Sequence, residues 1–191
     1  MRRPEAACRM VRPVDTPVTS PPLSTRAISG RRDFIVTRPT GAAVRTRIEQ
    51  TLAGSSCLTA MLDFSEIELV DLSCADEVVA KLLLAGRNAY FFVLQGLRED
   101  QHEAIDHVLT HHRLAVAAVP PGPGEPRLLG WVPSDAREAF ACICDCGPLG
   151  ANDLARARGW VESRSREALR SLASHRLVRP VGELYYPVPT A

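Results

Sequence analysis

Residues 61–86 contain side-chain types that can build a nucleophile, a phosphate site or a helix cap. The stretch reads MLDFSEIELVDLSCADEVVAKLLLAG, and its centre, DLSCADE, covers residues 71–77. A phosphate at the start of a helix is stabilised by free backbone N–H groups and by the helix dipole. A cysteine in the same place can have a lowered pKa and act as a nucleophile. The position of these residues relative to a helix start therefore decides what chemistry they can do.

Ser73 is the residue of this stretch that we expect to begin a helix. A serine side chain accepts a hydrogen bond from a free N–H group of the first turn, and Asp76 three residues later completes an imperfect capping box. Phosphorylation of Ser73 is the alternative, although the carboxylates of Asp76 and Glu77 would repel a phosphate there. We therefore interpret Ser73 as a helix cap first and as a candidate phosphosite second.

Catalysis by Cys74 would need a base, and the candidate bases are histidines of a later segment. His107, His111 and His112 belong to a different predicted helix, and nothing in the sequence brings them to Cys74. His107 and His111 are four residues apart and could share a metal ion, but no motif supplies further ligands. The sequence also lacks the glycine-rich motifs that bind nucleotide phosphates. It therefore predicts a protein that is not an enzyme and has neither a metal site nor a cofactor.

The chain has six cysteines, and their spacing argues against a disulfide framework and against structural zinc. Cys142, Cys144 and Cys146 form a C-x-C-x-C run, whereas zinc sites usually use C-x2-C pairs or Cys/His clusters. The other three are Cys8, Cys57 and Cys74. Separate, reduced thiols in an intracellular compartment are the favoured interpretation.

The net charge of +1 conceals an uneven distribution of charge along the chain. Residues 1–32 carry seven Arg against two carboxylates, residues 33–150 nine Lys and Arg against sixteen, and residues 151–191 seven Arg against four. An acidic middle between basic ends fits a protein-binding module flanked by segments that can contact a polyanion. Residues 1–31 are rich in Pro and Arg and have no apolar period, which predicts a disordered basic tail.

Hydrophobic residues make up 46% of the 191-residue chain, so a real core is expected. No apolar run approaches the roughly 18–20 residues that cross a bilayer. The N-terminus is basic but lacks the apolar segment of a secretory signal. We therefore expect a cytoplasmic protein without membrane contact.

Residues 32–132 alternate between strand-like and helix-like patterns. Predicted strands cover residues 33–37, 57–64, 89–97, 115–119 and 127–132, and residues 67–70 extend the second region beyond a bend at Ser65-Glu66. Predicted helices cover residues 40–54, 74–86 and 99–114. In the first helix, Val44, Ile48 and Leu52 form one apolar stripe, and Gly54 ends it. This alternation indicates an α/β fold with a mixed, mostly parallel sheet packed with helices.

Residues 134–191 follow a different pattern, with three predicted helices and a hairpin. Ser134 and Asn152 are candidate N-caps of the first two helices, and Gly159 ends the second. The third helix covers residues 161–178, and the hairpin covers residues 179–188 with Gly182 at its turn. Three helices followed by a β-wing are the parts of a winged helix-turn-helix. We therefore predict a small α+β winged-helix domain at residues 134–191.

The segment LDFSEIELVDLSCADEVVAKLL, residues 62–83, resembles the core of a STAS domain, and more closely the STAS-like domains of bacterial regulators. In that family a central strand ends in an Asp-Ser-Ser/Thr-Gly loop that begins the next helix. In the anti-sigma-factor antagonists, a partner kinase phosphorylates the serine that follows this Asp. The resemblance covers about residues 32–132 and implies a STAS-like α/β domain. It also implies a protein partner, either an anti-sigma factor or a sensor-kinase-like ATPase of the GHKL type.

The sequence departs from the antagonist pattern at the phosphoacceptor. Placing Asp71 on the family's Asp puts Leu72 at the phosphoacceptor position, and leucine cannot be phosphorylated. Ser73 then falls on the second Ser/Thr position and Cys74 on the glycine. The resemblance implies that this loop and the following helix contact the partner. The predicted contact residues are Asp71, Leu72, Ser73, Cys74, Asp76 and Glu77.

In a winged helix, the third predicted helix would enter a major groove of DNA. The predicted DNA contacts on it and at the start of the wing are Ser163, Arg164, Arg166, Arg170 and Arg179. Arg156 and Arg158 are better placed for phosphates. Arginines on an exposed helix are also common on a merely solvated face, and many winged helices dock proteins, so both alternatives stay open.

These features predict a non-enzymatic bacterial regulatory protein. Its STAS-like domain would bind a protein partner, and its C-terminal winged helix would bind DNA or transmit the signal. The alternative is a DNA-binding transcription factor whose α/β domain senses a small ligand or dimerises. A cysteine enzyme built on Cys74 is a third, weaker alternative.

Overall fold

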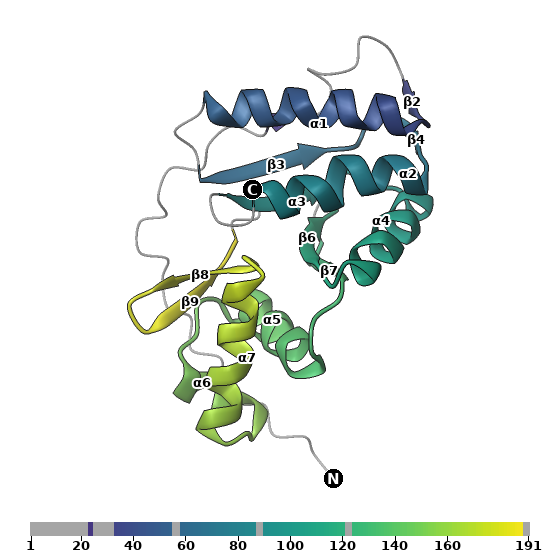
Figure 1. Ribbon diagram of the computed structural model, residues 1–191. Coiled ribbons are helices and arrows are strands. Elements are labelled where there is room, and N and C mark those ends of the chain that lie inside the picture. The colour runs from purple at the N-terminus through teal and green to yellow at the C-terminus, as the bar shows by residue number, and fades with distance from the viewer. Residues whose placement is uncertain (1–22, 25–32, 55–57, 87–89, 121–123, 189–191) are drawn as a thin grey trace.

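The computed structural model describes residues 23–24, 33–54, 58–86, 90–120 and 124–188. It shows an α/β fold with a mixed, mostly parallel sheet packed with helices, as the sequence predicts (Figure 1). The main sheet has the strand order β1-β3-β5-β6-β7. Its strands are β1 (Leu23–Ser24), β3 (Thr59–Asp63), β5 (Phe91–Gln95), β6 (Ala115–Val119) and β7 (Arg127–Gly130). The first four are parallel, and β7 is antiparallel to β6.

Most of the predicted basic tail lies outside the described residues, as do Cys8 and Cys57. The part that is described, Leu23–Ser24, pairs with Leu62 and Asp63 at the edge of the sheet. Among the residues that the structure describes, no helix combines the length and the apolar character needed to span a bilayer.

The expected bend at Ser65-Glu66 is confirmed, but residues 67–70 do not extend the preceding strand. They form a separate strand, β4 (Ile67–Val70), which pairs in parallel with β2 (Asp33–Ile35) as a second, two-stranded sheet. The chain turns between β3 and β4 because the carbonyl of Phe64 accepts a hydrogen bond from the N–H of Ile67. Such a tight turn redirects the chain and cannot continue the pairing of β3.

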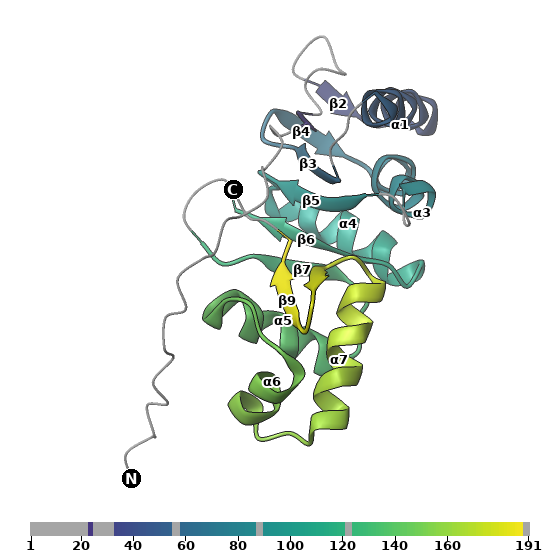
Figure 2. The same ribbon diagram turned by 90° about the vertical axis from the view of Figure 1, so that its left-hand side faces the viewer.

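Helices α1 (Arg38–Ala53) and α4 (Glu99–His111) lie with the helical segment 72–86 on one face of the main sheet (Figure 2). That segment consists of α2 (Leu72–Ala75), the π-helix η2 (Asp76–Ala80) and α3 (Lys81–Gly86). The predicted apolar stripe of α1, Val44, Ile48 and Leu52, is buried, and Gly54 ends the helix. Helix α1 begins before the predicted start, because the Thr37 side chain accepts a hydrogen bond from the N–H of Thr40.

Apolar residues cover both faces of the main sheet. Side chains such as Leu62, Leu94 and Val116 belong to the core that the sheet shares with α1, α3 and α4. Because side chains alternate along a strand, Ala115 and Ala117 face the other way and belong to a core shared with residues 134–188. The predicted division of the chain near residue 133 therefore runs through a common core, and the division into domains stays a prediction.

Residues 134–188, the C-terminal module, form three helices and a hairpin in the predicted order. These are α5 (Ser134–Cys146), α6 (Ala151–Arg158), α7 (Glu162–Ser174), β8 (Val178–Val181) and β9 (Leu184–Pro187). Gly159 ends α6 in the left-handed conformation, and Gly182 has a positive φ at the hairpin turn. An isolated antiparallel bridge between Leu149 and Tyr185 ties the α5–α6 connection to the hairpin.

The predicted caps of α5 and α6 are wrong. Pro133 and Gly150 occupy the N-cap positions, and neither helix start has a side-chain cap from Ser134 or Asn152. The fixed φ of proline suits a helix entry. Gly150 lies against the hairpin, since a Cβ there would be 3.3 Å from the carbonyl oxygen of Glu183. Tertiary contacts, and not cap side chains, therefore fix these two helix starts.

Side-chain hydrogen bonds connect helix α5 to β7, the edge strand of the main sheet. The guanidinium of Arg137 donates hydrogen bonds to the carbonyls of Leu128 (2.9 Å) and Gly130 (2.8 Å) on β7. A carboxylate oxygen of Asp106 accepts the N–H of Gly130 at 2.7 Å. Unsatisfied edge groups invite pairing with other chains, so these bonds both close the edge and position the C-terminal module.

Candidate functional site

The helix at the centre of the predicted site begins at Leu72, and Asp71 is its cap. One carboxylate oxygen of Asp71 accepts the N–H of Cys74 at 2.7 Å and the hydroxyl of Ser73 at 2.9 Å. The prediction that Ser73 caps the helix is therefore wrong. Ser73 lies inside the first turn because β4 ends at Val70, which leaves Asp71 at the position from which a side chain reaches the free N–H groups.

The carboxyl group of Asp71 is held in its charged form. Partial burial raises its pKa, but the hydrogen bonds from the Cys74 N–H and from Ser73 outweigh this and place the pKa below the usual value. The cap therefore combines a charge-assisted hydrogen bond with a favourable interaction between a negative charge and a helix start.

Replacing Asp71 with alanine is expected to lower the free energy of unfolding by about 1 kcal/mol at neutral pH, the usual cost of losing a cap. Because the folded-state pKa is lowered, this contribution exists above the unfolded pKa and is lost as the pH falls through the folded value. Urea unfolding at neutral and at acid pH measures the difference. Ser73→Ala is the control, because it leaves the bond from the Cys74 N–H intact. An Asp71→Ala variant as stable as the wild type at neutral pH would contradict this account of the cap.

Three apolar side chains are exposed around this helix start. Leu72 is 52% exposed, and Val36 and Leu69 are also exposed. Ile35 pairs with Val70 where both strands of the small sheet end, so Val36 and Leu72 follow neighbouring strand ends, and Leu69 lies within β4 just before them. We call Val36, Leu69 and Leu72 the corner patch. Exposed apolar groups that lie together on one surface are typical of interaction sites.

Cys74 has the environment of a structural cysteine. It is buried, and its thiol donates a hydrogen bond of 3.0 Å to the carbonyl of Thr37. Burial, followed by the nearby carboxylate of Asp71, raises the pKa of Cys74 to about 11. At neutral pH the thiol is therefore protonated and is a poor nucleophile. The predicted contact of Cys74 with a partner would require this buried side chain to become accessible.

Asp76 and Glu77 lie in the π-helix η2, one helical turn after Leu72, and form a network of ion pairs. The side chain of Glu77 is only 5% exposed and pairs with Arg38 (3.4 Å), Arg45 (3.5 Å) and Lys81. Asp76 pairs with Arg38 (3.5 Å) and Lys81 (3.7 Å). The network joins α1 to the helical segment 72–86, so both acids stabilise the corner from inside.

Helix α1 can approach this network closely because it carries Gly41. A Cβ at this position would be 3.0 Å from the Cβ of Glu77 and 3.2 Å from the Cα of Cys74. The end of a third helix joins the same network, since the Nε2 of His112, the residue after α4, lies 2.8 Å from a carboxylate oxygen of Asp76. The corner patch is therefore supported by three tightly packed helical segments.

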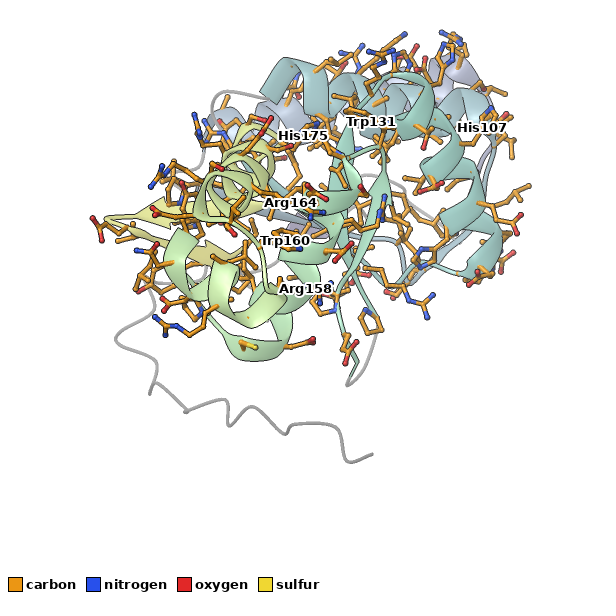
Figure 3. All side chains as sticks on the ribbon, turned by 90° about the horizontal axis from the view of Figure 1, so that it is seen from below. His107, Trp131, Arg158, Trp160, Arg164 and His175 are labelled. Carbon is orange, nitrogen blue, oxygen red and sulfur yellow. The ribbon has the colours of Figure 1, made fainter. Side chains whose placement is uncertain are left out.

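The histidines of α4 do not assemble a metal site among the described residues. No group of three or more His, Cys, Asp or Glu side chains in that part of the chain is arranged to hold a metal ion. His112 contacts Asp76, and His111 packs edge-on against His112 with 5.2 Å between the ring centroids. His107 lies one turn before His111 in α4, and Figure 3 shows it apart from Trp131 and His175.

The predicted DNA contacts of the C-terminal module separate into two groups. Ser163, Arg166 and Arg170 are exposed on α7, although Arg166 pairs with Glu162. Arg179 is directed at the main sheet, where it donates a hydrogen bond of 3.0 Å to Thr59. Its guanidinium also lies 5.2 Å from the ring centroid of Phe91. Arg179 therefore contacts the main sheet and does not face the solvent as a DNA contact would. The predicted contacts that remain exposed are those on α7.

Arg164 belongs to a clamp that the sequence analysis did not identify. Its guanidinium donates two hydrogen bonds to Asp135, at 2.7 and 2.6 Å, and lies 4.4 Å from the ring centroid of Trp160. Arg158 lies 5.9 Å from the same ring and pairs with Glu138 (Figure 3). The hydrogen bonds of Arg164 lower the pKa of Asp135. Each arginine of the clamp is thus matched by a carboxylate of α5.

Several functional features were missed because they depend on contacts between distant segments. The patterns of β4 and of α1 did not single out Leu69, Arg38 or Arg45, since each belongs to an ordinary strand or helix. Asp135 and Glu138 are three residues apart on α5, a spacing that places them on one helical face. That spacing is the only local signal for the clamp. The chain matches no model of a known protein family, no curated protein and no solved structure.

Proposed function

We propose that this chain is a non-enzymatic regulatory protein whose α/β part binds a protein partner through the corner patch. The observation that carries the proposal is the exposure of Leu72, Val36 and Leu69 at the ends of two paired strands and at the helix start that follows. Apolar side chains at the centre of an interface usually supply most of its binding energy. The Asp71 cap and the buried Glu77 network hold the patch in one conformation, which lowers the entropy cost of binding.

The resemblance to STAS-like domains suggests what kind of partner this is. It favours an anti-sigma factor or a sensor-kinase-like ATPase of the GHKL type, acting in the cytoplasm. Leu72 stands where the antagonists carry the phosphoacceptor serine, so binding through it would not be controlled by phosphorylation at that residue. Phosphorylation of Ser73 would instead replace a hydroxyl that donates to Asp71 with a group that this carboxylate repels. We therefore propose that modification of Ser73 would weaken the corner.

We further propose that the C-terminal module is a winged helix that contacts nucleic acid. The order of three helices and a hairpin supports this, as does the bridge between Leu149 and Tyr185. The exposed residues Ser163, Arg166 and Arg170 on α7 are the candidates for contact. The hairpin tip carries the apolar and acidic side chains Val181, Glu183 and Leu184, which would not attract phosphates. The proposed nucleic-acid contact is therefore assigned to α7 and not to the hairpin.

A small-ligand sensor, the alternative function, finds less support. A pocket between the sheet and the C-terminal module is lined by apolar residues that include Leu83, Phe92 and Leu177. Its volume is about 30 Å³, whereas pockets for small ligands usually measure about 300–1,000 Å³. The pocket would hold only one or two water molecules.

Replacing Leu72 with aspartate is expected to abolish partner binding, because a charge would replace an apolar contact at the centre of the interface. A pull-down with the tagged full chain, followed by mass spectrometry, measures which proteins are retained. Leu58→Asp is the matched control, since Leu58 is 61% exposed and lies outside the patch. A protein retained by wild type and Leu58→Asp but lost from Leu72→Asp would support the proposal. Equal recovery of all interacting proteins by both variants would contradict it.

A further inference from the structure

The same type of turn occurs twice in the chain, at the C-terminal ends of two helices that are far apart in the sequence. Residues 109–114 read LTHHRL and residues 172–177 read LASHRL, so both follow the pattern Leu-x-x-His-Arg-Leu. Each segment ends a helix and leads into a strand, α4 into β6 and α7 into β8. The second leucine donates its N–H to the carbonyl of the first in both cases, at 2.9 Å in the first turn and 3.0 Å in the second. These are the bonds of a Schellman helix end.

The arginine of each turn occupies a conformation in which glycine is usual. Arg113 has a φ of 54° and Arg176 a φ of 58°. Left-handed backbone is costly for a residue with a Cβ, and glycine would avoid the cost. Both side chains lie over aromatic rings, Arg113 at 5.9 Å from the centroid of Trp131 and Arg176 at 4.9 Å from that of Phe91. Each of the two left-handed turns thus places an arginine side chain next to an aromatic ring.

The two turns meet at Trp131. The ring centroids of Trp131 and His175 are 6.4 Å apart, and Figure 3 shows the two side chains near each other. The N–H of Trp131 donates to the carbonyl of Leu114 at 2.8 Å. Gly130 permits this approach, because a Cβ there would be only 2.2 Å from the same carbonyl oxygen. Trp131 is nevertheless 42% exposed, so the fold presents a fixed aromatic ring to the solvent.

The two turns carry cations and no carboxylates of their own, although Asp106 accepts the N–H of Gly130 beside Trp131 and Asp76 contacts His112 beside Arg113. No Asp or Glu occurs between Asp106 and Glu125 or between Glu167 and Glu183, the segments that contain the two turns. Within the described part of the chain, Arg113 is exposed and forms no ion pair. The Trp160 clamp has the same combination of ring and arginine, but there Asp135 and Glu138 neutralise the cations. Of these two ring clusters in the described part of the chain, the cluster at Trp131 is the one whose arginine has no carboxylate partner.

We infer that Trp131, Arg113 and His175 form a contact site for single-stranded nucleic acid. An exposed ring can stack on an unpaired base, and a neighbouring arginine can contact the adjacent phosphate. An acidic peptide would satisfy the charge but would leave the face of the ring without a stacking partner. The inference rests on the nucleic-acid part of the proposed function but places the contact at the seam between sheet and module. It does not depend on the corner patch.

The test uses the two tryptophans of the chain as separate reporters. In a Trp160→Phe background, Trp131 is the sole tryptophan, and an oligothymidylate of about 15 nucleotides is expected to quench its fluorescence at low salt. Arg113→Gly keeps the turn and relieves its strain while it removes the cation, so the fold is preserved. We expect Arg113→Gly and Trp131→Ala each to weaken binding at least about fivefold. Arg176→Gly, the same change in the matching turn over Phe91, should leave affinity unchanged.

Any one of the following results would contradict the inference. If the oligonucleotide does not bind at low salt, the site does not exist. If Arg113→Gly and Arg176→Gly lose the same amount of affinity, binding depends on overall positive charge and not on this site. Tighter binding of duplex than of single strand would show that stacking does not contribute, and binding of polyglutamate as strong as that of the oligonucleotide would point to an acidic protein. Loss of binding only in Arg166→Ala and Arg170→Ala would keep the proposed winged-helix function and eliminate this site.

Discussion

Replacing Phe140 with alanine is expected to lower the free energy of unfolding by about 3–5 kcal/mol, the cost of removing a large buried ring. Phe140 lies on α5 and is buried in the core that also contains Ala115, Ala117 and Leu128 of the main sheet. The cavity would therefore weaken the sheet and the C-terminal module together. We expect one cooperative transition, because neither part has a complete core without the other.

The positions of the two tryptophans allow this to be measured on both sides of the shared core. Trp131 follows the edge strand of the sheet, and Trp160 lies between α6 and α7. Urea unfolding of single-tryptophan variants, with and without Phe140→Ala, should give coincident transitions that shift by the same amount. Phe140→Leu, which leaves a smaller cavity, gives a milder variant if the alanine protein does not fold. Two separate transitions, of which only the Trp160 signal shifts, would contradict a common core.

Replacing Glu77 with alanine is expected to lower the free energy of unfolding by about 2–4 kcal/mol. Removing one partner of a buried ion pair usually costs about 3–5 kcal/mol, because the other charge is left without compensation. Here Arg38 is largely exposed and Lys81 is partly exposed, so both can return to water and reduce the cost. The remaining loss comes mainly from Arg45, whose Nε is buried and has no hydrogen-bond acceptor.

Chemical denaturation of Glu77→Ala and Glu49→Ala separates a buried pair from a surface pair. Glu49 pairs with Arg45 at 3.1 Å and is itself far more exposed than Glu77, and pairs near the surface contribute about 0–1 kcal/mol. Glu77→Gln should be intermediate, since it keeps the shape of the side chain and removes the charge. If Glu77→Ala were no less stable than Glu49→Ala, the network could not be what fixes α1 against the π-helix.

The sequence predicted those features of the fold that depend on local periodicity. The stripe Val44, Ile48 and Leu52 was confirmed because a spacing of four residues determines one face of a helix wherever the helix packs. The helix ends at Gly54 and Gly159 were confirmed, and Gly159 adopts the left-handed conformation that favours glycine at a helix end. Strand pairing was less accessible, and the separate strand β4 was missed because its partner β2 lies more than thirty residues earlier.

The candidate site shows the same division between local and distant information. Asp71 and Ser73 are both good cap residues, and local propensity does not choose between them. The residue that caps the helix is determined by where β4 ends, and the pairing of Val70 with Ile35 fixes that end. Arg179 was expected on an outer surface, but the hairpin lies against the sheet and directs it to Thr59. The exposure of Leu72 was not predicted either, because the expected cap at Ser73 placed Leu72 before the helix and not in its first turn.

The most direct test of the proposed partner binding is photo-crosslinking from the corner patch itself. A benzophenone amino acid placed at residue 72 reacts only with groups within a few ångströms, and the same label at residue 58 reports an exposed position elsewhere. Illumination of the full chain in cells is predicted to give one abundant protein adduct from residue 72 that is absent from residue 58. If residue 72 gives no protein adduct, or gives the same adducts as residue 58, the corner patch is not a binding surface.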